Sequence, residues 1–177
     1  MREVSVKEHN INPFMAFSNE WMALTVGNEK DGFNSMTIAW GHLGALWERE
    51  RHTNRLPTAV CYVRPGRYTK VFMDKEEYFT LSCFDKKYKK ALAYLGTHSG
   101  RDEDKVKNAG LTPVFADETV YFAEAKVVYV CRKIYQAPIQ KEGFIDKDLI
   151  NFNYPNQDFH EMYVGEIVKI LVRTETY

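Results

Sequence analysis

The sequence has no excess of charge of either sign and few cysteines. Its 177 residues include 24 Lys and Arg against 24 Asp and Glu, so the formal net charge at pH 7 is zero. A neutral chain has no global field that attracts polyanions, so we expect no nucleic-acid partner, and any anion must be bound by a local cluster of cations. The three cysteines, Cys61, Cys83 and Cys131, lie far apart in apolar runs. This placement indicates buried, reduced thiols.

Long apolar segments and several common motifs are also missing. No stretch approaches the ~18 apolar residues of a membrane span, and residues 1–10 lack the apolar core of a secretion signal. We therefore expect a cytoplasmic protein with no membrane partner. The motifs G-x-G-x-x-G, G-x-x-x-x-G-K-[ST], H-E-x-x-H, G-x-S-x-G and C-x-x-C are absent, and the five histidines lack metal-ligand spacing. These absences argue against Rossmann, P-loop, zincin, hydrolase and zinc-ribbon folds and against a metal site.

The composition that is present is globular and rich in aromatic residues. Hydrophobic residues make up 45% of the chain, charged residues 27% and aromatic residues 14%. Aromatic side chains suit half-buried strands better than a helical bundle. The length is that of one domain, so we expect residues 1–177 to form a single, mainly β domain.

Hydrophobic periodicity predicts six strands, over residues 20–27, 34–40, 58–64, 78–84, 119–134 and 160–172. Short helices are predicted after Pro65-Gly66, between an N-cap at Asp85 and a C′ glycine at Gly96, and over residues 102–108, whereas residues 151–158 read as a loop. The run 119–134 is long enough to require a curved barrel strand. Because turns and short helices join the strands, the predicted fold class is mainly β, an antiparallel β-barrel with short helices.

Two turns carry cations. Residues 64–70 hold Arg64, Arg67 and Lys70 with no acid at the start of a helix, where backbone N–H groups and guanidinium groups can bind a phosphate. Residues 99–101 form a loop that an anion can approach closely because Gly100 has no side chain. Each stretch taken alone could equally be a solvated surface turn.

Two strands contain residues that interrupt an apolar pattern. The first reads N-S-M-T-I-A-W-G over residues 34–41, and the second reads H-E-M-Y-V-G-E-I over residues 160–167. Gly165 in the second is predicted to mark a bulge or the close approach of a flat ligand. Small and polar residues of this kind also occur in ordinary cores and turns.

The four stretches together, in this order, resemble the flavin reductase-like family of FMN-binding split-barrel proteins. The matching patterns are N-S-M-T-I-A-W-G, V-R-P-x-R-Y-T, G-x-H-S-G-R-D-x-D-K and H-x-x-Y-x-G-E-I, within residues 33–168. The resemblance implies a six-stranded antiparallel split barrel and a homodimer with FMN near the subunit interface. It also implies flavin-dependent electron transfer.

The resemblance assigns site residues one by one. The isoalloxazine ring and ribityl chain would lie along Ser35, Met36, Thr37 and Trp40. The phosphate or ring would be contacted from the two turns by Arg64, Arg67, Tyr68, Thr69, Ser99, Gly100, Arg101 and Lys105. Phe84 and His160 are candidate walls of the pocket. The polar connection over residues 48–55 departs from the family pattern and leaves the electron partner open.

The function that the resemblance favours is an FMN-dependent oxidoreductase, which takes hydride from NAD(P)H and passes electrons to a second acceptor. The cofactor would supply the chemistry, so no catalytic side chain is required. One alternative is a flavin-binding electron-transfer protein of the flavoredoxin type, or a flavin carrier, without nicotinamide turnover. A second is a cofactor-free β-barrel module that binds another phosphate-bearing ligand or RNA.

Overall fold

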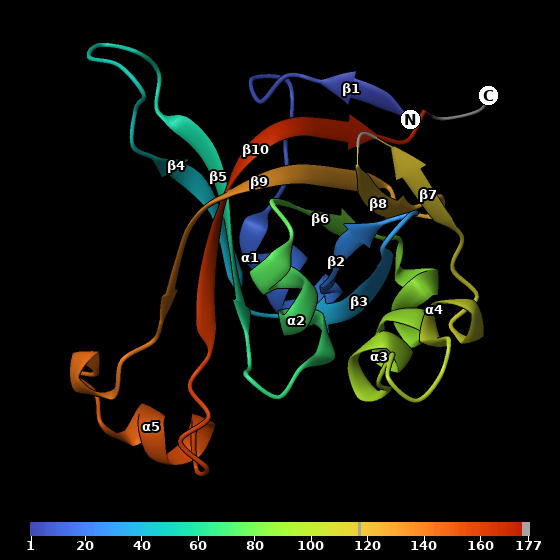
Figure 1. Ribbon diagram of the computed structural model, residues 1–177. Helices are drawn as coiled ribbons and strands as arrows, with labels where there is room; N and C mark the ends of the chain where they lie inside the picture. Colours follow the sequence, from blue (N-terminus) through green and yellow to red (C-terminus); the bar gives the residue numbers. More distant parts are fainter. Residues whose placement is uncertain (117, 175–177) are drawn as a thin grey trace.

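The computed structural model, which describes residues 1–116 and 118–174, is built around one coiled sheet of eight strands (Figure 1). The strand order is β3-β2-β6-β9-β10-β5-β4, and β1 pairs with β10. The bounds are β1 Arg2–Val4, β2 Met22–Asn28, β3 Gly32–Ile38, β4 Gly41–Leu46, β5 Leu56–Val63, β6 Tyr78–Cys83, β9 Val127–Pro138 and β10 Glu161–Val172. A second, two-stranded sheet pairs β7 Pro113–Ala116 with β8 Thr119–Phe122. Every strand pairing is antiparallel, as predicted.

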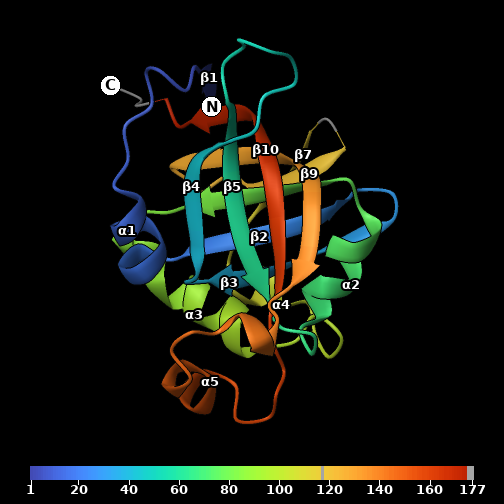
Figure 2. The ribbon, with the colours of Figure 1, turned by 90° about the vertical axis from the view of Figure 1, so that its left-hand side faces the viewer.

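The barrel is split between β3 and β4. These two strands follow each other in the sequence, but they form the opposite borders of the strand order. β9 and β10, each of 12 residues, are long enough to run through both halves of the coiled sheet. Figure 2 shows β4, β5, β10 and β9 running steeply across the front, with β2, β3 and β6 crossing behind them. The short link over residues 39–40 therefore carries the chain from one border of the sheet to the other.

Gly165 of β10 lies at a β-bulge. Val164 pairs with Tyr135 and Gly165 pairs with Lys133, so Ile134 of β9 is the extra residue at this register shift. A Cβ atom at Gly165 would lie 2.6 Å from Cζ of Phe79 and 2.8 Å from Cβ of Cys131. The prediction of a bulge is thus confirmed, and the flat group that approaches this glycine is the ring of Phe79.

Short helices flank the sheet: α1 Pro13–Met15 with the π-helical turn Ala16–Glu20, α2 Tyr68–Lys75, α3 Lys89–Thr97, α4 Lys105–Asn108 and α5 Asp148–Asn153. α5 lies on an excursion beyond the ends of β9 and β10, and α3 and α4 lie beside β2 and β3 (Figure 1). No helix in residues 1–116 or 118–174 is long and apolar enough to cross a membrane.

The core has two parts, which lie on opposite faces of β6. Phe79, Leu81 and Cys83 belong to a cluster inside the barrel. Phe84, directly after the strand, belongs to a second cluster with Leu92 and Leu95 of α3. Strand β6 is therefore covered on both faces. All three cysteines are buried free thiols, and burial raises the pKa of Cys61 and Cys83 to about 12.

The predicted strand over residues 119–134 is wrong, because the chain turns at residues 123–126. The N–H of Ala125 donates to the carbonyl of Phe122 in this turn, and β8 folds back on β7. Ala125 is fully buried although it lies in a turn, which is why the apolar alternation continues through the break. The short strands β1, β4 and β7 were not predicted, so within the described residues the six expected strands become ten in two sheets.

Three local predictions also need correction. Gly96 lies inside α3, which continues to Thr97, and Asp85 precedes a single 3-10 turn, Lys86–Tyr88, with no side-chain cap. A Cβ at Gly96 would lie 3.3 Å from Cβ of Thr37, so close packing between α3 and β3 is the reason for this glycine. Helix α5 extends into the predicted loop 151–158.

We predict that Gly165→Ala lowers the free energy of unfolding by about 1–3 kcal/mol, because the added methyl group meets Phe79 and Cys131 in a packed core. Denaturant titration measures the effect. Gly44→Ala on β4 is the matched control, since a Cβ there meets nothing within 4 Å. Equal stability of the two variants would contradict this account of the bulge.

Candidate functional site

Two adjoining cavities lie along β3, one of the two strands at the split in the barrel. The first, which we call the turn cavity, has a volume of about 100 Å³ and is lined by Met36, Gly66, Arg67, Tyr68, Thr69, Thr97, His98, Ser99 and Lys105. The second, the strand cavity, has a volume of about 180 Å³ and is lined by Met36, Thr37, Ile38, Ala39, Trp40, Tyr62, Arg64, Arg67 and His160. Because Met36 and Arg67 line both, the two cavities form one continuous furrow.

The structure brings the two predicted cationic turns together. A guanidinium N–H of Arg67 in the first turn donates to the carbonyl of Gly96, just before the second turn, at 3.0 Å. The guanidinium of Arg101 in the second turn lies 4.5 Å from the ring centroid of Tyr68 in the first. The convergence expected from the sequence is therefore present within a single chain.

Asn34 on β3 joins these turns and was not among the predicted site residues. Its Nδ2 donates to Oγ1 of Thr69 at 2.8 Å. Its Oδ1 lies where a Cβ at Gly100 would be only 2.3 Å away. Gly100 thus permits a close approach, but the group that approaches it is Asn34 and not the anion that the sequence analysis predicts. A buried amide in an otherwise apolar strand was the available signal for this role.

Lys105 supplies a buried cation at the turn cavity. Its side chain is 4% exposed, and Nζ donates to the carbonyls of Leu95 at 3.0 Å and His98 at 2.9 Å. Burial, and then the nearby charge of Arg67, lower the pKa of Lys105 to about 8. An anion in the turn cavity would favour the charged form of this lysine.

The turn cavity has the composition of a phosphate site. It contains the N-terminus of α2, whose first backbone N–H groups have no partner within the helix. Arg67, Lys105 and the hydroxyl of Ser99 line the same space. Among the described residues, no acidic side chain lines either the turn cavity or the strand cavity. A neutral protein thus concentrates positive charge at one place.

Strand β3 forms the long wall of the furrow. Since β3 is a border strand, its outer edge pairs with no other strand of the described sheet. Met36 and Thr37 line the furrow, and the exposed Trp40 stands at its far end. Ser35 does not line the furrow: it is fully buried, and its hydroxyl is bonded to Thr25 at 2.9 Å and to the carbonyl of Leu24 at 3.2 Å.

Arg64 lines the strand cavity, but its guanidinium is already engaged. It donates to the Asp158 carboxylate at 2.6 Å and to the carbonyl of Asn153 at 2.8 Å. It also lies 5.3 Å from the ring centroid of Tyr154. The hydrogen bond from Arg64, the largest cause, lowers the pKa of Asp158. Arg64 therefore anchors the excursion that carries α5 and leaves the turn cavity to the other cations.

His160, a predicted wall of the FMN pocket, lines the strand cavity, whereas Phe84 lines neither cavity. The His160 ring lies 4.7 Å from that of Trp40, and Nδ1 is 2.9 Å from the hydroxyl of Tyr154. Burial, and then the charge of Arg64, lower the pKa of His160 to about 4. Phe84 packs in the second core cluster against Phe122, away from both cavities.

We predict that His160 makes stability depend on pH. Its pKa is about 4 in the folded state and 6.5 when unfolded, so the unfolded state binds the proton first as the pH falls. The neutral His160 side chain therefore contributes to the free energy of unfolding in full above pH 6.5, and this contribution is lost as the pH falls towards 4. Its maximum is roughly 3 kcal/mol.

Denaturant titrations of the wild type and His160→Gln between pH 4 and 7 measure this contribution. The free energy of unfolding of the variant should change less steeply with pH than that of the wild type. Parallel curves would show that His160 does not titrate in this way.

Comparison with known proteins gives both a family and a fold. A search of curated proteins found no match. Among solved structures, flavoredoxin of Desulfovibrio vulgaris (Miyazaki F) is 20% identical, with a TM-score of 0.64 over 98% of this chain and 77% of that chain. An FMN-binding protein from Thermus thermophilus is 18% identical (TM-score 0.63; 98% and 82% covered). Nitrilotriacetate monooxygenase component B from Bacillus cereus is 16% identical (TM-score 0.64; 100% and 84% covered).

These structures share the fold of this chain. The sequence model described as "Flavin reductase like domain" matches residues 56–177, more than half of the chain. The match begins at β5 and includes both cationic turns, α3 and the last strand. The chain therefore belongs to the flavin reductase-like family and has its mainly β split-barrel fold.

Proposed function

We infer that this protein binds FMN in the furrow and is an FMN-dependent oxidoreductase. The observation that carries this proposal is the meeting of two cationic turns in one cavity at the end of a border strand. The family supports it, as do solved structures of the same fold that are named FMN-binding proteins. FMN, when bound, supplies the electron and hydride transfer chemistry.

The residues present fit a ribityl phosphate at one end and a flat ring along the strand. Arg67, Lys105 and the N-terminus of α2 would hold the phosphate dianion with charge-assisted hydrogen bonds. Met36 and Thr37 would contact the ribityl chain and ring, and Trp40 would border the ring. Backbone N–H groups on the outer edge of β3 would donate to the ring's polar edge and stabilise negative charge there.

We propose NAD(P)H as the electron donor, followed by transfer to a second acceptor. A flavin-binding electron-transfer protein is the second candidate, because flavoredoxin shares the fold. The site residues serve both functions in the same way: they bind and orient the cofactor without a side-chain nucleophile. The two functions differ in whether a reduced nicotinamide is consumed.

We also propose a homodimer. The outward face of β4, β5, β10 and β9 has no helix over it (Figure 2). On this face the register sets Val60 opposite Val164 and Tyr62 opposite Met162. Val60 and Val164 are already buried within the chain, whereas Tyr62 and Met162 are half-buried and Tyr135, which pairs with Val164, is 45% exposed. We propose that a second subunit covers these three side chains. The buried thiols agree with our proposal of a single-domain cytoplasmic protein.

The first experiment is a visible spectrum of the purified protein, or of the protein reconstituted with FMN. We predict a flavin spectrum that bleaches on anaerobic addition of NAD(P)H. A flavin spectrum that is reduced by dithionite but not by NAD(P)H would favour the electron-transfer protein. A protein that cannot be loaded with FMN, and whose affinity for RNA falls steeply with salt, would refute the flavin site.

We predict that Arg67→Ala weakens FMN binding by about 1.5–3 kcal/mol, or roughly 10- to 150-fold in Kd, because it removes a charge-assisted bond to the phosphate. We predict the same for Arg101→Ala, although the Arg101 guanidinium stacks on Tyr68 and does not line the turn cavity. Quenching of FMN fluorescence measures the affinity. Arg51→Ala, an exposed residue in the loop after β4, is the matched control and should bind FMN normally. Unchanged affinity in both site variants would remove the phosphate assignment.

A further inference from the structure

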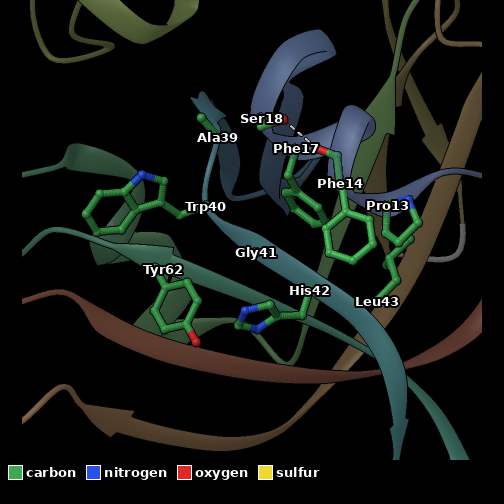
Figure 3. Close-up of a pocket in the computed structure, with 10 residues that line it drawn as sticks. All are labelled: Pro13, Phe14, Phe17, Ser18, Ala39, Trp40, Gly41, His42, Leu43 and Tyr62. Carbon is green, nitrogen blue, oxygen red and sulfur yellow. Dashed lines mark hydrogen bonds between the residues drawn. The ribbon is translucent and has the colours of Figure 1, made fainter. Parts of the chain in front are cut away.

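A third, larger cavity opens next to the furrow. It has a volume of about 620 Å³, within the range of about 300–1,000 Å³ that small-molecule sites occupy. It lies between α1 with the following π-helical turn on one side and the start of β4 with Tyr62 on the other (Figure 3). Ala39, Trp40 and Tyr62 line both this outer cavity and the strand cavity. An occupant of the outer cavity would therefore lie against the end of the furrow where Trp40 stands.

The walls of the outer cavity are held in place by the fold. Phe17 is buried, and a Cβ at Gly41 would lie 2.2 Å from its ring, so Gly41 allows the π-helical turn to pack on the chain at β4. The hydroxyl of Ser18 donates to the carbonyl of Phe14 at 2.6 Å, and this bond ties the π-helical turn to α1. Phe14 itself is 81% exposed and lines the cavity. Its ring is thus available to a ligand and is not needed by the core.

The chemistry of the outer cavity differs from that of the furrow. Its described lining contains no carboxylate, ammonium or guanidinium group. Burial raises the pKa of Tyr62, so its hydroxyl stays uncharged at neutral pH. The rings of Phe14, Trp40 and Tyr62 provide flat apolar surfaces, which favour stacked or edge-to-face contacts with another ring. The ionisable base in this lining is the imidazole of His42, so an anionic ligand would lose its hydration here without gaining an ammonium or guanidinium group.

We propose that the outer cavity binds an uncharged, flat aromatic compound as the second substrate of the FMN site. This inference rests on the proposed function, because it places the ligand beside the ring of the cofactor. It also restricts the ligand: the phosphates of a dinucleotide must lie outside this cavity. The charged end of the site, at the turn cavity, and the uncharged end, at Phe14, thus select different chemical groups.

The test uses calorimetric titration of the FMN-loaded protein with 2-naphthol, a neutral probe, and with naphthalene-2-sulfonate, an anion of the same ring system. We expect 2-naphthol to bind once per flavin and to perturb the visible flavin spectrum. The sulfonate should bind at least about tenfold more weakly, because its charge is left unpaired. Equal or tighter binding of the sulfonate would overturn the inference.

Variants at Phe14 locate the binding site. Phe14→Ala should weaken 2-naphthol binding roughly three- to tenfold while FMN affinity stays unchanged, and Phe14→Lys should raise the affinity for the sulfonate. The matched control is Phe152→Ala on α5, an 87% exposed phenylalanine outside all three cavities. An effect of Phe152→Ala equal to that of Phe14→Ala would contradict the assigned site.

The remaining outcomes separate this inference from the function on which it rests. Normal FMN binding without 2-naphthol binding overturns the inference alone, whereas failure to bind FMN overturns both. Light scattering is measured with and without saturating 2-naphthol. Dissociation of a dimer by the probe would show that a second copy of the chain fills the cavity, and this also overturns the inference.

Discussion

The site depends on one buried amide. Asn34 bonds Thr69 at the start of α2 through Nδ2, and its Oδ1 occupies the space that Gly100 leaves open. These two contacts fix both cationic turns against the same strand, although about 30 residues separate the turns in the sequence. Because Asn34 is almost fully buried, loss of the Thr69 hydroxyl would leave its amide N–H unsatisfied, and a side chain at position 100 would collide with its Oδ1. The contact therefore sets the positions of the helix N-terminus and of the second loop at the same time.

The cations at this junction are held by the end of α3. Arg67 bonds the carbonyl of Gly96, and Lys105 bonds those of Leu95 and His98. The last carbonyls of a helix have no partner within it and carry partial negative charge, so they favour cations there. This arrangement keeps two positive groups close together without a carboxylate that would compete with an anionic ligand. Burial and the nearby charge of Arg67 lower the pKa of Lys105, so binding of an anion in the turn cavity would favour the charged lysine.

The structural features that the sequence predicts correctly depend on hydrophobic periodicity and on local turn chemistry. The bulge at Gly165 follows from a glycine inside an apolar strand, and the antiparallel arrangement follows from the short connections between strands. The break between β8 and β9 could not be predicted, because buried Ala125 continues the alternation through a turn. Ser35 and Phe84 were misplaced for a related reason: neighbours in three dimensions decide which face of a strand is open. Asn34 was missed because its two partners are brought to it only by the tertiary fold.

The split explains why the two ends of the site differ in charge. The chain leaves β3 and enters β4 through residues 39–40, and these residues lie between the furrow and the outer cavity. On one side of the link, the ends of two helices and their cations surround the turn cavity. On the other side, the link meets α1 and the π-helical turn, whose side chains at the cavity are mainly apolar. Since Trp40 borders both spaces, one short connection separates a region suited to an anion from a region suited to a neutral ring. A closed barrel would pair β3 with β4 and would remove both the free edge of β3 and this division.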